Sequence, residues 1–252
     1  MTGPGPDDAV RQIAGWVRDG RKVVALTGAG ISVDSGIPDF RGAGGLWDRF
    51  DPMEYATLDA FLRRPEKVWE MIRAMNAVIE AARPNPGHLA LARLEAMGRL
   101  ASIVTQNIEN LHQEAGSRTV IEFHGNGKTL VCLECGRRVA AAEVSRDEFP
   151  PRCSCLRQPV LKPDVVFFGE MIPAEANSRA QAEATGCDVM LVVGTSAVVA
   201  PASSIPWIAR RNGAMVAEIN LEPTPLTGNV AHVSAWGSAS EILPRIADLV
   251  AG

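Results

Sequence analysis

Seven short apolar runs recur along the chain, and segments with helical periodicity separate most of them. Such runs predict strands, here at 22–27, 102–105, 119–123, 165–168, 188–193, 214–219 and 231–235. Helices are expected at 7–19, 58–82 with a break near Pro65, 86–97, 175–184, 203–212 and 240–250. Strands that are apolar along their whole length are typical of parallel sheets with both faces covered. The sequence therefore predicts an α/β fold with a doubly wound parallel sheet.

Two stretches do not follow this alternation, and we interpret them as inserts that together form a smaller module. The first, about 37–83, is rich in loop and helix signals, and the second, about 127–162, holds four cysteines and many turn residues. The remaining stretches, about 7–36, 84–126 and 163–252, are expected to form the core. The 252 residues are thus expected to be one domain with a small helical and metal-binding module inserted.

Composition excludes several classes of protein. Lysine and arginine total 25 and aspartate and glutamate 29, a net charge of −4, so the sequence lacks the surplus positive charge of a nucleic-acid-binding surface. Hydrophobic residues make up 46%, which is enough to bury a core. The most apolar stretch, 189–200, is too short to span a membrane. The first residues resemble no signal peptide, so we expect a cytoplasmic protein without a direct nucleic-acid or membrane partner.

Four of the five cysteines form two close pairs within 24 residues: Cys132, Cys135, Cys153 and Cys155. An odd number of cysteines argues against a disulfide framework. Four thiolates suit a tetrahedral Zn²⁺ ion and leave no position for water, so the expected site is structural. Buried free thiols are the alternative, and an iron–sulfur cluster is a less favoured occupant. Cys187 stands apart and is expected to be a small buried apolar side chain.

A glycine-rich segment directly follows the first predicted strand and consists of Gly28, Ala29, Gly30, Ile31 and Ser32. Small residues let backbone N–H groups approach a phosphate, and the Ser32 hydroxyl adds a donor. Val33 takes the place of the third glycine of a dinucleotide fingerprint, and no helix clearly starts here, so a structural turn is an alternative. In the next loop, Arg41 can face a phosphate and Phe40 can cover a ring; a surface loop with a solvated Arg41 is the alternative.

Polar or small residues follow several predicted strands at their carboxyl ends, where parallel sheets bind ligands. They are Gln106, Asn107 and Glu109 after 102–105, Gly194, Thr195 and Ser196 after 188–193, and Asn220 and Leu221 after 214–219. Amide side chains suit a carboxamide or a ribose, because they both donate and accept hydrogen bonds. For the segment after 102–105 taken alone, a helix N-terminus capped by Asn107 or Asn110 is the favoured interpretation. For the other segments, turns or packing positions are the alternatives.

Among the four histidines, His124 is the best placed for general base chemistry near neutral pH. It lies between an aromatic residue and a glycine at the carboxyl end of a predicted strand. His88 at a helix start and His232 at a strand edge are expected to be structural or exposed.

Together these motifs resemble the sirtuins, a family of NAD-dependent protein lysine deacylases. GAGIS, SGIPDFRG, TQNIENLH, FHGN, the paired cysteines, KPDVVFFGE, LVVGTS and EIN occur in the order of that family, from about Gly28 to Asn220, with a weaker match at 237–240. The resemblance implies one catalytic domain with a Rossmann-like NAD-binding core, a small zinc module, and a cleft between them that receives both substrates.

The resemblance also implies roles by position. Gly28, Ala29, Gly30, Ser32, Phe40 and Arg41 would belong to the NAD loop, and Gln106, Asn107 and Glu109 would surround the ribose and the nicotinamide. The rest of the dinucleotide would be held by Gly194, Thr195, Ser196, Asn220, Leu221 and Ala239. His124 and Asn107 would be catalytic, with His124 as general base. Val166, Phe168 and Gly169 would line the acyl-lysine tunnel, and the protein or peptide substrate would pair as a strand between the two modules.

In the implied reaction, NAD is a co-substrate and is consumed. The Zn²⁺ ion is structural and takes no part in the chemistry. The acyl oxygen attacks the anomeric carbon of the nicotinamide ribose and expels nicotinamide. This forms an alkylimidate. His124 then takes a proton from a ribose hydroxyl so that the 2′-oxygen can attack the imidate carbon, and water completes the reaction to free lysine and acyl-ADP-ribose. The alternatives are protein mono-ADP-ribosyl transfer at the same NAD site, a non-catalytic NAD-binding scaffold and, least favoured, a hydride-transferring dehydrogenase.

Some positions bear on specificity or depart from the family pattern. Glu109 stands where the family often has aspartate, and the second cysteine pair has only one residue between its members. Family members that favour succinyl-lysine carry a Tyr-x-x-Arg pair on the helix before the segment 85–88, where this chain has Ile72 and Met75. Apolar residues there leave a buried carboxylate unpaired, which predicts acetyl or longer hydrocarbon acyl groups. Simple packing of both residues in the helix core is the alternative and gives the same exclusion of succinyl.

Overall fold

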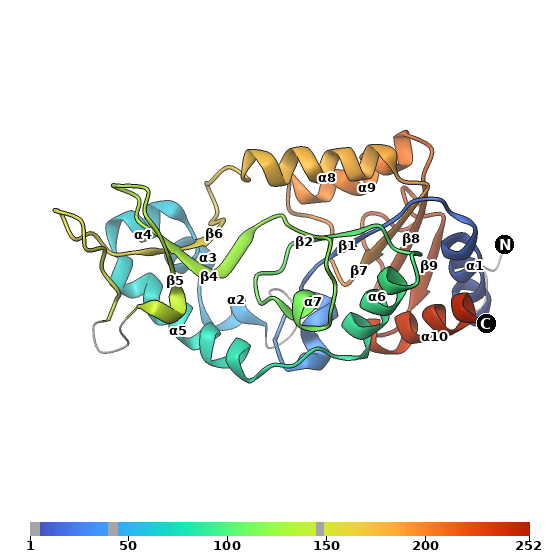
Figure 1. The fold of residues 1–252 in the computed structure, drawn as a ribbon, viewed down its shortest axis with the longest axis horizontal. Coiled ribbons are helices and arrows are strands. Elements are labelled where there is room, and N and C mark those ends of the chain that lie inside the picture. The colour runs from blue at the N-terminus through green and yellow to red at the C-terminus, as the bar shows by residue number, and fades with distance from the viewer. Residues whose placement is uncertain (1–5, 40–44, 145–148) are drawn as a thin grey trace.

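The computed structural model describes residues 6–39, 45–144 and 149–252, which form a large α/β unit and a smaller module beside it (Figure 1). The large unit contains a six-stranded sheet of β1 Val23–Thr27, β2 Ser102–Thr105, β3 Val120–Glu122, β7 Val189–Val193, β8 Met215–Asn220 and β9 Val233–Trp236. All neighbouring strands are parallel, in the order β3-β2-β1-β7-β8-β9. This order is that of the Rossmann fold. The predicted doubly wound sheet is confirmed.

Helices cover both faces of the sheet, which explains why its central strands are apolar throughout. On one face lie α1 Pro6–Asp19, α6 Pro86–Ala96 and α10 Ala239–Ala251, and on the other lie α8 Ala174–Gly186 and α9 Ile205–Arg211 (Figure 1). Every residue of β1, β2 and β7 is buried. Cys187 is buried in the second of these layers, as predicted.

The order of the strands reverses between β1 and β7, and this point positions the site. Thr27 of β1 pairs with Val193 of β7, so the two strands end at the same level. The chain leaves these strands toward different sides of the sheet, and in such folds the crevice between the departing loops binds ligands.

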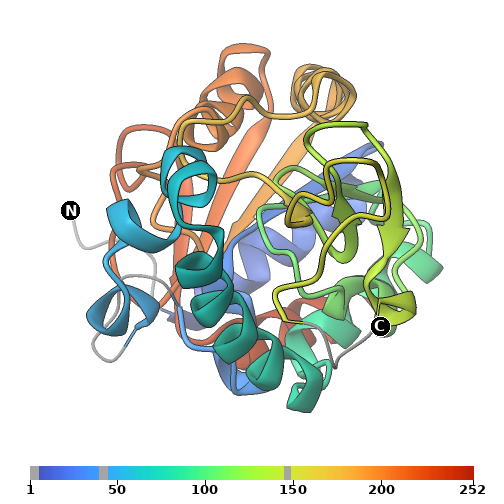
Figure 2. The ribbon, with the colours of Figure 1, turned by 90° about the vertical axis from the view of Figure 1, so that its left-hand side faces the viewer.

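The smaller module combines helices from one insert with strands from the other. It contains α2 Leu46–Arg49, α3 Pro52–Tyr55, α4 Leu58–Arg63 and α5 Pro65–Ala81, and a three-stranded antiparallel sheet of β4 Gly125–Val131, β5 Arg138–Ala140 and β6 Lys162–Val165. Viewed from this end, α3, α4 and α5 lie on one side and the strands on the other (Figure 2). The two parts share one buried core that includes Phe61, Trp69 and Leu130. The helix break near Pro65 is confirmed.

The strand expected at 165–168 is found earlier, at Lys162–Val165, and it does not join the large sheet. It pairs with β4 at the edge of the small sheet. Pro163 explains this placement, because proline lacks the N–H of a central strand and is confined to edge strands or bulges. The apolar run predicted a strand but carried no information about its partner.

Short elements complete the fold and include one that the sequence did not predict. A 3₁₀ helix, η1 Ala29–Ser35, follows Gly28 and ends at Gly36, whose φ of 85° is left-handed. The expectation that no helix begins in this segment is therefore wrong. The others are α7 Leu111–Glu114, η2 Ala141–Glu143 and η3 Ala202–Ser204. Throughout the three described ranges, we find no helix with the length and apolar character needed to cross a membrane.

Candidate active site

A cleft of about 1570 Å³ opens between the large unit and the smaller module. It is lined by every described residue that the sequence assigned to NAD, to catalysis or to the acyl-lysine tunnel: Gly28, Ala29, Gly30, Ser32, Gln106, Asn107, Glu109, His124, Val166, Phe168, Gly169, Gly194, Thr195, Ser196, Asn220, Leu221 and Ala239. Phe40 and Arg41 lie outside the described residues. Segments from seven regions of the chain thus converge on one cleft.

The glycines after β1 and β7 allow these two loops to touch backbone to backbone. Gly28 N donates to Val193 O at 3.0 Å, and Gly30 N donates to Gly194 O at 2.8 Å. A Cβ atom on Gly30 would lie 2.7 Å from Gly194 Cα, and one on Gly194 would overlap Ile31 N. Gly194 also has a φ of 57°. Close packing of the switch point therefore requires small residues here, whether or not a phosphate also approaches them.

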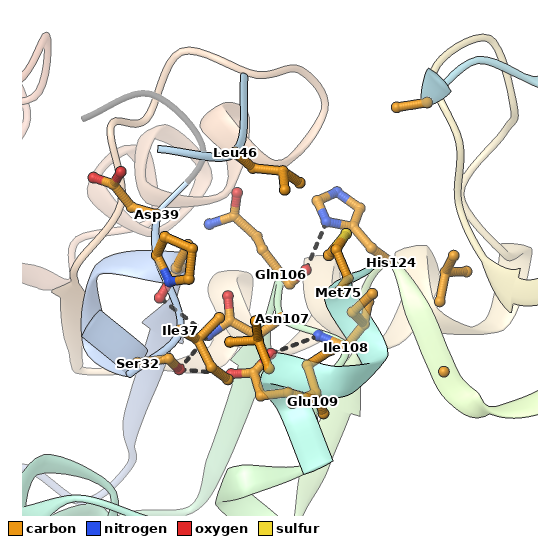
Figure 3. Close-up of a pocket in the computed structure, with 18 of the residues that line it drawn as sticks. Ser32, Ile37, Asp39, Leu46, Met75, Gln106, Asn107, Ile108, Glu109 and His124 are labelled. Atoms are coloured by element: carbon orange, nitrogen blue, oxygen red, sulfur yellow. Dashed lines mark hydrogen bonds between the residues drawn. The ribbon is translucent and has the colours of Figure 1, made fainter. Parts of the chain in front are cut away.

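A relay of hydrogen bonds links three polar side chains at the floor of the cleft (Figure 3). Ser32 Oγ donates to Glu109 Oε1 at 2.6 Å and accepts from Asn107 Nδ2 at 3.2 Å. Asn107 Nδ2 also donates to Gly28 O at 3.1 Å. Among the described atoms, Asn107 Oδ1 is buried and has no hydrogen-bond partner. The relay fixes the amide with its oxygen free to accept a hydrogen bond from a ligand.

Neither Asn107 nor Asn110 caps a helix through its side chain, although Asn110 occupies the N-cap position of α7. Asn110 precedes α7 but has a φ of 68°, and its side chain makes no capping bond. It instead donates to Asn126 Oδ1 at 3.2 Å. Asn107 lies four residues before α7, and its side chain bonds to Ser32 and Gly28. Its position after β2 was the available signal for a ligand-binding role, although the segment alone favoured a helix cap.

Glu109 is as buried as Asn107. Its Oε2 accepts from Ile108 N at 3.0 Å, so the carboxylate folds back onto its own loop. Burial raises the pKa of Glu109, and the hydrogen bond from Ser32 opposes the shift only in part. Glutamate is one methylene longer than the aspartate that the family often has here, and the hydrogen bonds to Ser32 and Ile108 accommodate it.

His124 lies at the end of β3, on the opposite side of the cleft from Ser32 (Figure 3). Its Nδ1 lies 2.9 Å from Gln106 O, a carbonyl oxygen, so Nδ1 must donate and Nε2 is the basic nitrogen. Burial lowers the pKa of His124, and the bond to Gln106 only partly opposes this. The imidazole is therefore a neutral base near pH 7.

Hydrogen bonds between side chains and neighbouring loops hold the strand ends together. Gln106 Nε2 donates to Thr195 Oγ1 at 3.0 Å, and Asn220 Nδ2 donates to Thr195 O at 3.0 Å. The segments after β2, β7 and β8 are thereby fixed relative to one another. Leu221 is exposed at the rim of the cleft.

Two further histidines lie behind the relay. His88 and His112 are buried with ring centroids 4.9 Å apart, and His112 Nε2 lies 2.9 Å from Thr27 Oγ1. Burial lowers the pKa of His88 to about 4 and that of His112 to about 3, so both rings are neutral. The structural interpretation of His88 is supported, and the exposed one is wrong. The Asn85-x-x-His88 spacing could have indicated this structural role, because the two residues form a capping box at the start of α6.

The four cysteines meet at the end of the small sheet. Their Sγ atoms all lie within 4.8 Å of one another, with Cys132 to Cys155 at 3.9 Å and Cys135 to Cys153 at 3.8 Å. Tetrahedral zinc with Zn–S bonds of about 2.3 Å requires sulfurs about 3.8 Å apart. Although burial opposes it, hydrogen bonds from the N–H groups of Cys135 and Glu134 lower the pKa of Cys132 to about 7. The donor set therefore fits one closed, structural Zn²⁺ site, and the Cys-x-Cys pair is compatible with it.

A model of the Sir2 family matches residues 28–201, more than half of the chain. The chain belongs to the Sir2 family. It is 48% identical over 238 residues to NAD-dependent protein deacylase 2 of Pyrobaculum aerophilum, and the match covers 94% of each chain. A solved Sir2 homologue in complex with NAD has a TM-score of 0.89 and 39% identity, covering 100% of this chain and 96% of that chain. A Sir2 enzyme bound to a myristoylated histone peptide has a TM-score of 0.82 and 36% identity, covering 97% of both chains. The resemblance inferred from the motifs is confirmed.

Proposed function

We propose that this chain is an NAD-dependent protein lysine deacylase that transfers the acyl group of its substrate to ADP-ribose and releases nicotinamide. One observation carries the proposal most strongly. The unpartnered Asn107 Oδ1 and the basic ring of His124 border the same cleft, at the switch point of a Rossmann sheet. Membership of the Sir2 family supports the same activity.

NAD is the substrate that fits this end of the cleft. Asn107 Oδ1 is an acceptor for a ribose hydroxyl or a carboxamide N–H group, and the Ser32–Glu109 relay orients it. The backbone N–H group of Ala29, together with Thr195 and Ser196, would face the phosphates. Asn220, Leu221 and Ala239 would hold the adenosine half.

His124 acts as the general base. Its neutral ring takes a proton from a ribose hydroxyl, and the bond from Nδ1 to Gln106 O orients the ring and stabilises the cation that forms. Bound NAD supplies an electrophilic anomeric carbon and a nicotinamide leaving group.

The acyl-lysine would enter between the two modules, where Val166, Phe168 and Gly169 line the cleft. Phe168 is 40% exposed and available to a peptide. The complex of a relative with a myristoylated histone peptide supports protein or peptide substrates. Ile72 and Met75 also line the cleft, so we propose that uncharged acyl groups are favoured over succinyl. We further propose that the enzyme acts in the cytoplasm and has no direct nucleic-acid partner.

The test uses an acetyl-lysine peptide and NAD that is labelled in its ADP-ribose part, and it measures nicotinamide release in parallel. We expect the label in a small acyl-ADP-ribose product. Label on protein instead would favour mono-ADP-ribosyl transfer, and no release would favour a binding scaffold. Replacing His124 with alanine should lower turnover by about 10²–10⁴-fold.

A further inference from the structure

A buried ion pair lies behind the segment that carries Val166, Phe168 and Gly169. The side chain of Lys162 on β6 is 3% exposed, and its Nζ lies 2.8 Å from Oε2 of Glu170, which is 19% exposed. The ammonium also donates to Val165 O at 2.6 Å and to Pro163 O at 3.1 Å. An ammonium has three N–H groups, so all of its donors are satisfied within the segment 162–170.

The same pair holds a turn in one conformation. Glu170 Oε2 accepts from Phe167 N at 2.7 Å, and Glu170 N donates to Phe167 O at 3.0 Å. Gly169 has the positive φ of 87° that this turn requires. The Lys162 ammonium lies 4.2 Å from the centroid of the Phe167 ring. The pair thus keeps Phe167 buried, while Phe168 points outward and is partly exposed.

The outer side of this segment is connected to the catalytic histidine and to the helices of the small module. Val166 N donates to His124 O at 2.8 Å. Phe168 N donates to Ala56 O at 2.9 Å, and Leu58 N donates to Phe168 O at 3.0 Å. A change in the turn would therefore move the wall of the acyl-lysine tunnel relative to His124.

Stability alone does not account for an ion pair at this position. Burial lowers the pKa of Lys162, which means that the charged form is disfavoured there, and Glu170 opposes the shift only in part. Apolar residues of similar volume often replace such pairs with no loss of stability. What the pair provides is directional: three hydrogen bonds join it to the backbone, and with the contact between Lys162 and Glu170 they fix the path of the chain from Pro163 to Glu170.

We propose that Lys162 and Glu170 are positioning residues for the acyl-lysine substrate: their buried ion pair fixes the 165–169 segment from behind, so that Val166, Phe168 and Gly169 hold the peptide against His124. The inference rests on the proposed deacylase function and adds two residues to it: Lys162 lies behind the wall of the cleft, and Glu170 also borders the cleft. It concerns binding of the peptide and leaves binding of NAD unchanged.

The experiment compares Lys162→Met, Lys162→Arg and Glu170→Gln in the full chain. Arg138→Met is the matched control, because it removes the ion pair of exposed Arg138 with Asp164 on the same small sheet. Initial rates are measured with an acetyl-lysine peptide varied at saturating NAD, and with NAD varied at saturating peptide. NAD binding by calorimetry and the melting temperature report on the fold.

We expect Lys162→Met to raise the KM for the peptide by about tenfold or more, because small displacements of a positioned substrate are costly. The KM for NAD should stay within about twofold, while Lys162→Arg restores most of the peptide KM and Arg138→Met changes neither. An unchanged peptide KM in a Lys162→Met protein that binds NAD normally would overturn the inference. If Lys162→Met does not bind NAD, Glu170→Gln decides by the same criterion. A wild-type protein that releases no nicotinamide would instead contradict the proposed function.

Discussion

The acid–base behaviour of His124 follows from two features of its surroundings. Burial lowers its pKa below the ordinary value of 6.5, and the bond to Gln106 O opposes this only in part. The base must be neutral to accept a proton, so activity falls as the pH drops through the pKa of the folded enzyme. We therefore predict that the acidic limb of kcat/KM has its midpoint below pH 6.5, which a pH–rate profile with the acetyl-lysine peptide measures. A midpoint at or above 6.5, or the same limb in the residual activity of His124→Ala, would contradict this.

The acyl preference depends on two residues of α5. Ile72 is buried and Met75 half-buried, and both border the cleft. Arg73 borders it as well, but it is exposed and lies 5.4 Å from the centroid of the Phe149 ring. A succinyl carboxylate in the tunnel would thus remain unpaired, and we predict at least about a hundredfold lower kcat/KM for succinyl-lysine than for acetyl-lysine peptide.

Butyryl-lysine is the size-matched neutral control, since it has the same chain length as succinyl without the carboxylate. It should be cleaved far better than succinyl-lysine if charge decides the preference. The Ile72→Tyr/Met75→Arg variant should narrow the gap between acetyl and succinyl. Faster desuccinylation by the wild-type protein would show that the alignment of α5 with the acyl pocket is wrong.

Single residues also show what the sequence could and could not reveal. His124 could be predicted as a site residue because it directly follows a strand of a parallel sheet, where ligands bind. For Asn107 the local segment alone favoured a helix cap, and its role followed only from the resemblance to the family. The burial of Lys162 could not, because a lysine is normally exposed and its partners Val165 and Glu170 surround it only once β6 joins the small sheet. Local patterns identify an element, whereas burial of a charged side chain depends on the tertiary fold.

Elements differ in the same way. The central strands were recognisable because every residue of β1 and β7 is buried. The short helix η1 has no periodic apolar face, since its seven residues bury only Ile31 and Ser32, and its sequence therefore read as a loop. The pairing of β6 depended on contacts with β4, more than thirty residues earlier in the chain, and no periodicity encodes such a contact.

The small antiparallel sheet is the element whose stability depends on the metal. Its cysteines lie on the turn after β4 and on the segment before β6, so one zinc ion joins the two ends of the insert. We predict one zinc per chain, and Cys135→Ala should lose the metal and unfold this module at lower temperature. Metal analysis and thermal melting test this.

Cys187→Ala is the matched control, because Cys187 is a buried thiol in the large unit, away from the four-cysteine cluster. It should retain its zinc and lose only the small packing contribution of one sulfur. A Cys135→Ala protein that keeps its zinc and its melting temperature would contradict the structural role of the site.

At the scale of the whole molecule, the loops that leave the two halves of the Rossmann sheet at the switch point meet through glycines. Gly194 packs against Gly30 and Ile31 across the switch point, and its φ of 57° disfavours any other residue. We predict that Gly194→Ala lowers the free energy of unfolding by about 2–4 kcal/mol, because a methyl group there would separate the loops. It should also weaken NAD binding, since the same loops border the proposed phosphate site.

Gly15→Ala is the matched control: a Cβ on Gly15, within α1, has no neighbour within 4 Å, so alanine should stabilise the protein by about 0.5–1 kcal/mol. Urea unfolding of both variants, followed by calorimetry with NAD, separates the effects. Equal free energies of unfolding for the two alanine variants would mean that the contact between the two loops does not contribute to the stability of the protein.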